Sequence, residues 1–153
     1  MKKLFIAAMM CLMGVIAQAQ VITSETINNL YLSSIVESGN KFAYNAESDD
    51  DNNITTMYVY RKIAQPKGEV SLEPVCRYQY EYAADGLLKS RTKCEWKNGE
   101  WQCTGRLDYT LMADLYTVEY SRWNAKTGTF DEAIDKMSYT LYADSSELQV
   151  AGL

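Results

Sequence analysis

The residues of this sequence that could do chemistry are carboxylates, cysteines and aromatic rings, because the chain contains no histidine. Without an imidazole, the sequence excludes the usual serine and cysteine catalytic dyads and triads, and it offers no imidazole ligand for a metal. Catalysis by a pair of carboxylates remains. The candidates for such a pair are Asp108, Glu119, Asp131, Glu132 and Asp135. They are scattered, and beside Arg106, Arg122 or Lys136 they are typical of cross-strand ion pairs. We therefore predict that the protein is not an enzyme.

One acidic segment resembles the start of a calcium-binding loop, with Asp49, Asp51 and Asn53 at alternate positions. A complete loop needs a glycine next and a glutamate roughly six residues later. This chain has Ile54 and Tyr60 at those places, which favours a solvated acidic loop. No glycine-rich loop precedes a helix, so nucleotide binding has no support either. The sequence predicts no metal and no other cofactor.

The cysteines indicate a disulfide. Cys94 and Cys103 flank the dipeptide at residues 98–99, Asn-Gly, which is the strongest short signal for a β-hairpin. A two-residue loop puts Trp96 opposite Trp101 and Cys94 opposite Cys103, both at non-hydrogen-bonded sites where side chains approach closest. We predict a Cys94–Cys103 disulfide.

A Cys76–Cys94 disulfide stays open as the alternative. If residues 84–86 form the loop of the preceding hairpin, Cys76 also lies opposite Cys94. The sequence does not choose between the two pairings.

Aromatic rings are the remaining chemical signal, with twelve tyrosines and three tryptophans. The ordinary role of such rings is to fill a hydrophobic core. The functional interpretation is that Trp96, Trp101 and Trp123 form an exposed platform, since flat rings with polar edges stack well on sugar rings or on a partner's surface.

The elements that must position these side chains form a repeat. Three hexapeptides at residues 80–85, 109–114 and 139–144 begin with tyrosine and end in Ala-Asp, at spacings of 29 and 30 residues. Each hexapeptide alternates apolar and polar residues and then ends at a turn signal. In the first copy, Gly86 suits a left-handed loop position. The pattern predicts β-hairpin repeats of about 30 residues.

The predicted fold is all-β, an antiparallel meander of about six to eight strands in a curved sheet or open barrel. The predicted strands are residues 54–63, 70–83, 87–97, 100–112, 115–123 and 130–143. Alternation places Cys76, Tyr78, Tyr80 and Tyr82 on one face, and it groups Trp101 and Cys103 with Leu107, Tyr109 and Leu111. No predicted helix is large enough to cover the aromatic face, so we expect the sheet to curl, to pack on its N-terminal part, or to dimerise.

Residues 23–37 carry apolar side chains at helical spacing, but the runs at 30–32 and 35–36 would serve a strand equally well. We expect a strand or irregular structure here. The predicted organisation is a signal peptide at residues 1–19, an N-terminal segment with the acidic loop at 20–53, and a hairpin domain at 54–153 that forms one domain with that segment.

The signal peptide is predicted from Lys2 and Lys3, a following apolar run, and a small-residue cleavage site that ends at Ala19. Its removal leaves 13 basic and 20 acidic residues, a net charge of −7. Such a surface repels phosphate backbones, so nucleic acid is excluded as a partner. We expect an exported protein, periplasmic or at the cell surface, with no membrane insertion after cleavage.

The segment Tyr80-x-Tyr82-x-x-x-Gly86-x-Leu88 resembles one unit of the tyrosine-aspartate (YD) repeats of large secreted bacterial proteins. Ala83 and Leu87 depart from that pattern, so the resemblance implies only a hairpin-sheet architecture. With its Lys-Lys signal, mature Gln20 and tyrosine-rich hairpins, the whole chain resembles small exported proteins of unknown function from Bacteroidetes-type bacteria. That resemblance implies no site residues.

We therefore predict an exported, non-enzymatic binding or interaction module whose partner is an unknown protein or glycan. The alternatives are a glycan-binding protein that uses the aromatic platform, and a structural envelope protein that assembles through its sheet, with a homodimer as the simplest form.

Overall fold

The computed structural model of the chain describes residues 21–37, 39 and 41–141, so the predicted signal peptide and the third Ala-Asp turn lie outside the described residues. In the described part, helix α2 (Ser24–Glu37) precedes eight strands. These are β1 (Phe42–Ser48), β2 (Ile54–Ala64), β3 (Val70–Tyr82), β4 (Leu88–Lys97), β5 (Glu100–Met112), β6 (Leu115–Asn124), β7 (Thr129–Phe130) and β8 (Asp135–Thr140).

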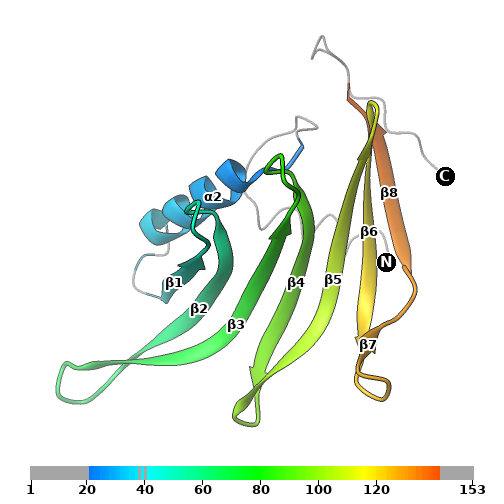
Figure 1. Cartoon of the computed structure of the whole chain (residues 1–153). Coiled ribbons are helices and arrows are strands. Elements are labelled where there is room, and N and C mark those ends of the chain that lie inside the picture. Colours follow the sequence, from blue (N-terminus) through cyan, green and yellow to red (C-terminus); the bar gives the residue numbers. More distant parts are fainter. Residues whose placement is uncertain (1–20, 38, 40, 142–153) are drawn as a thin grey trace.

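The strands form one open, twisted antiparallel sheet in which neighbours in sequence are neighbours in space (Figure 1). The order is β1-β2-β3-β4-β5-β6-β7, and β8 also pairs with β6. The predicted antiparallel meander is thus confirmed, with eight strands in an unclosed sheet. No helix among the described residues is long and apolar enough to cross a membrane.

The predicted turns are where the sequence placed them. Asn98 and Gly99 both have positive φ, 53° and 84°, as a two-residue hairpin loop of this kind requires. Gly86 has a φ of 81° in the turn between β3 and β4. At the second Ala-Asp turn, Ala113 takes the left-handed conformation with a φ of 54°.

Within the described residues, the last predicted strand, 130–143, is not continuous but is broken into β7 and β8. Asp131 donates its backbone N–H to Arg122, whereas Ile134 donates to Tyr120. Three residues therefore span a step that two residues span on β6, and the extra residue interrupts the ladder. Strand β1 is an addition to the predicted set.

The expectation of strand or irregular structure for residues 23–37 is wrong, because this segment forms α2. Thr23 Oγ1 accepts the backbone N–H of Thr26, and Thr26 Oγ1 accepts that of Thr23, each at 3.3 Å. This reciprocal cap satisfies two of the donors that a helix start leaves open. The apolar residues that suggested a strand, Leu32 and Val36, are exposed on the outer side of the helix.

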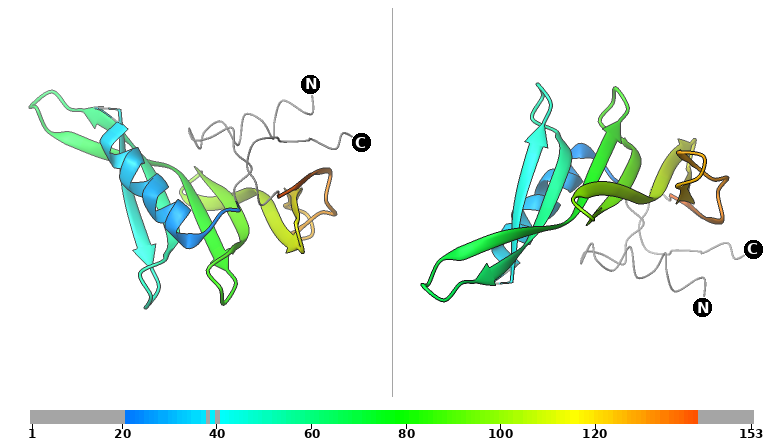
Figure 2. Two further views of the ribbon diagram at one scale, coloured as in Figure 1. Left: turned by 90° about the horizontal axis from the view of Figure 1, so that it is seen from above. Right: turned by 90° about the horizontal axis from the view of Figure 1, so that it is seen from below.

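Helix α2 lies across one face of the sheet, over β1 to β3 (Figure 2), and this helix-covered face holds the core. Ile27, in the first turn of the helix, is fully buried in that core. The first tyrosines of the first two repeats, Tyr80 and Tyr109, lie in the core beside Tyr116. The repeat therefore places one tyrosine of each hairpin on the same buried face.

Two of the four register shifts in the described sheet, both in the pairings of β4, change which face the cysteines and tryptophans lie on. Tyr82 pairs with Leu88 but Glu81 pairs with Ser90, so Lys89 is an extra residue in β4. Farther along β4, Lys93 pairs with Gly105 but Cys94 pairs with Cys103, so Thr104 is an extra residue in β5. Each bulge shifts the register by one residue and reverses the face on which the following side chains lie.

The bulge at Thr104 corrects one predicted face. Leu107 and Tyr109 are in the core as expected, but Trp101 and Cys103 lie on the opposite face of the sheet. Strict alternation along β5 would have put all four together, and the extra residue between them breaks that alternation. The face assignment of Tyr78 and its alternate neighbours on β3 is confirmed.

Candidate functional site

The face of the sheet that α2 does not cover, here called the open face, carries a group of four aromatic residues. Strand β2 supplies Tyr58 and Tyr60, β4 supplies Trp96, and β5 supplies Trp101; we call these the aromatic cluster. Tyr58 and Tyr60 reach this face because they alternate with Met57 and Val59, which line the space under the helix.

Trp101 is the centre of the aromatic cluster. Its ring centroid lies 4.9 Å from that of Trp96 and 5.9 Å from that of Tyr58. Tyr58 stands on β2 and Trp101 on β5, so the two rings meet above β3 and β4. The two rings therefore lie over the side chains of β3 and β4 between them.

The side chains below the aromatic cluster are a cation and the disulfide. The Arg77 guanidinium lies 5.3 Å from the Trp101 ring centroid, a cation–π distance. Cys94 and Cys103 are directly opposite each other with their sulfur atoms bonded, as predicted. Cys94 is fully buried on this side although no helix of the described residues covers it.

The alternative Cys76–Cys94 pairing is wrong, and the bulge at Lys89 is the reason. With an unbroken register from the turn, Cys76 would face Cys94; the extra residue moves Cys76 opposite Glu95. Cys76 is a buried free cysteine in the described part of the chain. Burial raises the pKa of its thiol.

Trp123 lies apart from the aromatic cluster. It packs edge-to-face on Phe130 at 5.0 Å, and the Arg106 guanidinium is 5.9 Å from the Phe130 ring centroid. Arg106 also forms ion pairs with Glu81 and Asp108 on the open face. The structure thus brings together Trp96 and Trp101 of the three predicted platform residues.

The platform is not flat. The rings of Trp96 and Trp101 make an angle of 68°, and Tyr58 is tilted by 54° from Trp101. Trp96 is 38% exposed at the rim, and the other three rings are half-buried. The aromatic cluster is therefore a group of tilted, partly exposed rings and not a flat surface.

The carboxylates singled out from the sequence do not converge. Asp108 is paired with Arg106, and Glu119 is paired with Lys136 across the strands at 3.0 Å. Asp131 accepts a hydrogen bond from the Asn124 side chain. Glu132 and Asp135 form no ion pair within the described residues, where five such pairs are present in all.

The acidic loop is closed by its own hydrogen bonds. Asp49 accepts the backbone N–H groups of Asp51 and Asn53 and the side-chain amide of Asn53. These bonds, those from Asn53 first, lower the pKa of the Asp49 carboxyl. No group of three or more potential metal-ligating side chains occurs in residues 21–37, 39 and 41–141.

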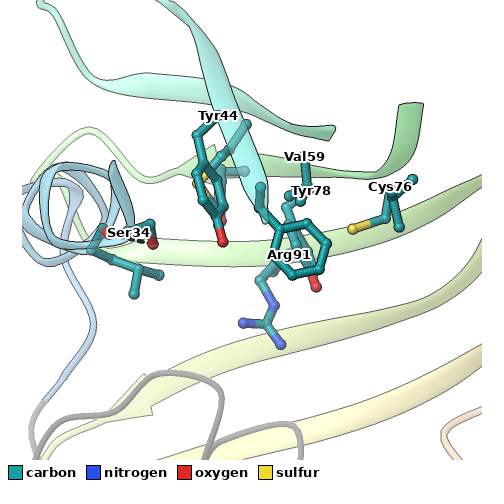
Figure 3. A pocket seen from close by; sticks show the side chains of 11 residues that line it. Ser34, Tyr44, Val59, Cys76, Tyr78 and Arg91 are labelled. Carbon is teal, nitrogen blue, oxygen red and sulfur yellow. Dashed lines mark hydrogen bonds between the residues drawn. The ribbon is translucent and has the colours of Figure 1, made fainter. Parts of the chain in front are cut away.

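A second feature escaped the sequence analysis, a cavity of about 250 Å³ between α2 and the helix-covered face (Figure 3). Arg91 of β4 lies in its lining and is only 5% exposed. The sequence signal for a buried arginine was weak, because Arg91 is a single basic residue in a predicted strand. Its burial follows from its place opposite Tyr80 on the helix-covered face.

Comparison with known proteins gives three solved structures with the same fold. The first is a DUF3836 family protein from Bacteroides vulgatus ATCC 8482, with a TM-score of 0.57 and 18% identity, covering 64% of this chain and 97% of that chain. A DUF3836 family protein from Parabacteroides distasonis ATCC 8503 has a TM-score of 0.53 and 17% identity, covering 67% and 92%.

The third structure is a protein with unknown function from Bacteroides fragilis NCTC 9343, with a TM-score of 0.51, 19% identity, and coverage of 76% and 96%. At these identities the likeness shows the fold, and it agrees with the expected similarity to Bacteroidetes proteins of unknown function. No curated protein matches the chain. Residues 1–141 match the model of one family over most of the chain, and the protein therefore belongs to DUF3836, a family of unknown function.

Proposed function

We propose that this protein is an exported, non-enzymatic binding module that holds a glycan against the aromatic cluster on its open face. The observation that carries the proposal is the group of partly exposed rings centred on Trp101, on a sheet face that no described helix covers. Aromatic rings with apolar faces and polar edges are suited to stack on sugar rings.

The surroundings of the aromatic cluster support a neutral, hydroxyl-rich ligand. Tyr58 donates its hydroxyl to Glu47 at 3.0 Å, and the Arg77 guanidinium lies against the Trp101 ring. The Glu47 carboxylate and the Arg77 guanidinium therefore both already contact rings of the aromatic cluster, and a ligand without a charge leaves these contacts intact. A strongly anionic ligand would also meet the negative net charge of the chain.

The test is a titration of tryptophan fluorescence with a panel of host and dietary polysaccharides, using the chain without residues 1–19. We expect a saturable change with at least one polysaccharide. The change should be lost in Trp96→Ala, which removes the exposed ring at the rim and leaves Trp101 over the disulfide. Trp123→Ala is the matched control, because it removes a tryptophan outside the aromatic cluster, and it should bind as the wild type does.

No response across the panel, or undiminished binding by Trp96→Ala, would contradict the glycan proposal. Export is tested separately by mass spectrometry of the protein recovered from cells. Cleavage after Ala19 predicts a chain that begins at Gln20. The resemblance of residues 80–88 to a YD-repeat hairpin belongs to the same proposal, and it is supported by the tight turn at Gly86.

Assembly through the sheet is the second candidate, and one observation favours it. Strand β1 ends the sheet, and its outer edge pairs with no strand in the described part of the chain. Unpaired strand edges are templates for pairing with another chain. Sizing by light scattering decides this point: an envelope component should form dimers or larger species, and a binding module of one chain should remain a monomer.

A further inference from the structure

The cavity under α2 is built like a ligand site, with an apolar wall and a few polar groups. Leu30 of the helix and Met57 and Val59 of β2 supply apolar lining, together with Phe42 and Val75. Its volume of about 250 Å³ equals that of roughly eight liquid water molecules at 30 Å³ each. This space suits a small organic molecule with an apolar body.

The polar groups of the cavity are collected at one place. Tyr44, Cys76, Tyr78 and Arg91 come from β1, β3 and β4 and gather between the helix and the sheet (Figure 3). Burial raises the pKa of the Tyr44 and Tyr78 phenols, so each is a neutral hydroxyl at physiological pH. These groups offer donors for hydrogen bonds.

Arg91 is the group that demands a partner. The residue is only 5% exposed, and its Nε is buried without a hydrogen-bond acceptor. Its guanidinium lies 5.4 Å from the Tyr78 ring centroid. None of the ion pairs within the described residues includes Arg91. A buried charge without a counter-ion is costly, and a carboxylate is the partner that a guanidinium fork fits best.

We infer that the cavity binds a small apolar carboxylic acid, such as a medium-chain fatty acid, whose carboxylate pairs with Arg91 and whose chain lies against Leu30, Met57 and Val59. The site is on the helix-covered face of the sheet, so it is separate from the aromatic cluster and goes beyond the proposed function. A phosphate or other fully polar anion would leave the apolar wall without contacts.

The probes are hexanoate, octanoate and decanoate, with octanol as the uncharged analogue of octanoate. Isothermal titration calorimetry and thermal unfolding of the chain without residues 1–19 measure binding. We expect saturable heat and a rising Tm with at least one acid, because a ligand that binds only the folded state stabilises it. Octanol should bind roughly tenfold or more weakly, since it lacks the charge-assisted hydrogen bonds.

Two variants separate binding from folding. Arg91→Met removes the cation but keeps an apolar side chain of similar length, so the protein should fold and should lose octanoate binding. Arg77→Met is the matched control, because Arg77 also has a buried Nε without a partner but lies on the open face. It should keep octanoate binding.

A third variant, Ser34→Leu, fills the cavity from the helix and should weaken binding of every acid while Arg91 stays in place. Octanoate should also slow the alkylation of Cys76, whose side chain lines the same cavity. The inference is wrong if none of the three acids gives heat or a Tm shift. It is equally wrong if folded Arg91→Met binds octanoate as well as the wild type does, or if a structure shows a carboxylate of the chain itself on the guanidinium.

Discussion

At the residue scale, the cysteines make a direct test of the register. Cys94 and Cys103 are bonded, whereas Cys76 is a free thiol with 8% exposure whose pKa is raised by burial. The thiolate is the reactive form, and a raised pKa leaves little of it at neutral pH. Cys76 should therefore be slow to react while the chain is folded.

The measurement is alkylation by iodoacetamide followed by mass spectrometry, on the chain without residues 1–19. We expect no rapid adduct in the folded protein, one adduct after unfolding without reductant, and three after unfolding with reductant. Three adducts without reductant would contradict the disulfide, and rapid labelling of the folded protein would contradict the burial of Cys76.

Gly105 is a second position where one residue matters. A Cβ added there would lie 2.6 Å from the ring of Tyr120, which covers the glycine from the neighbouring strand. Gly105→Ala should lower the free energy of unfolding by about 1–3 kcal/mol, because the ring has to move. The check is urea unfolding of Gly105→Ala against the wild type, and of the double variant Gly105→Ala/Tyr120→Leu against Tyr120→Leu. In the Tyr120→Leu background the alanine should cost much less, and an equal cost would contradict the steric cause.

At the element scale, α2 is attached to the sheet mainly through Ile27. This side chain is fully buried in the core, whereas Leu32, on the outer side of the same helix, is 59% exposed. Ile27→Ala should reduce the free energy of unfolding by about 2–5 kcal/mol through the lost burial and the cavity left behind. Leu32→Ala should change it by about 0.5 kcal/mol or less. Urea unfolding measures both, and similar losses would mean that the helix packs by its other side.

The bulge at Thr104 is the element that joins two halves of β5 with opposite facing. The Asn-Gly turn fixes the pairing of Cys94 with Cys103, and the core fixes Leu107. Deleting Thr104 cannot satisfy both, so either the disulfide or the core loses its register. We expect the deletion to lower the Tm far more than deletion of Thr127 in the exposed loop before β7. Equal effects on Tm would show that the bulge is dispensable.

The hairpins could be predicted from the sequence and helix α2 could not, because a turn is specified by neighbouring residues whereas the choice of a helix here depended on packing. A turn such as residues 98–99 is specified by two neighbouring residues that tolerate positive φ. The spacing of Ile27 and Leu30 agreed with a helix, yet the apolar Leu32 beside them suggested a strand. The structure leaves Leu32 exposed, so its contribution to the pattern carried no information about packing.

At the scale of the whole molecule, the tyrosine core makes stability depend on alkaline pH. Burial raises the pKa of Tyr80, Tyr109 and Tyr116 above the ordinary value of 10.0, and it raises that of Tyr139 to about 12. The unfolded chain ionises at lower pH than the folded chain. Stability from these groups is therefore fully present below pH 10 and is lost as the pH rises through the folded pKa values.

We expect cooperative unfolding at alkaline pH, in which circular dichroism and tyrosinate absorbance change together. Tyr139→Phe keeps the ring that packs edge-to-face on Tyr116 and removes one ionising hydroxyl, so the transition should move to higher pH. Gradual ionisation with the fold intact would contradict the linkage, and an unchanged midpoint in Tyr139→Phe would exclude Tyr139 from it.

The sequence by itself determined the features whose causes are local. The Asn-Gly loop set the pairing of Cys94 with Cys103, and alternation put Tyr78 and Tyr80 on one face. These features depend on turn chemistry and on the two-residue period of a strand, which neighbouring residues specify.

Tertiary structure alone decided the features that depend on distant partners. The extra residue Lys89 moves Cys76 away from Cys94, and the extra residue Thr104 puts Trp101 on the open face. Tyr58 meets Trp101 across two strands, and Arg91 is buried by a helix more than fifty residues before it. Packing energy between segments far apart in the chain fixes such positions, and no local pattern records it.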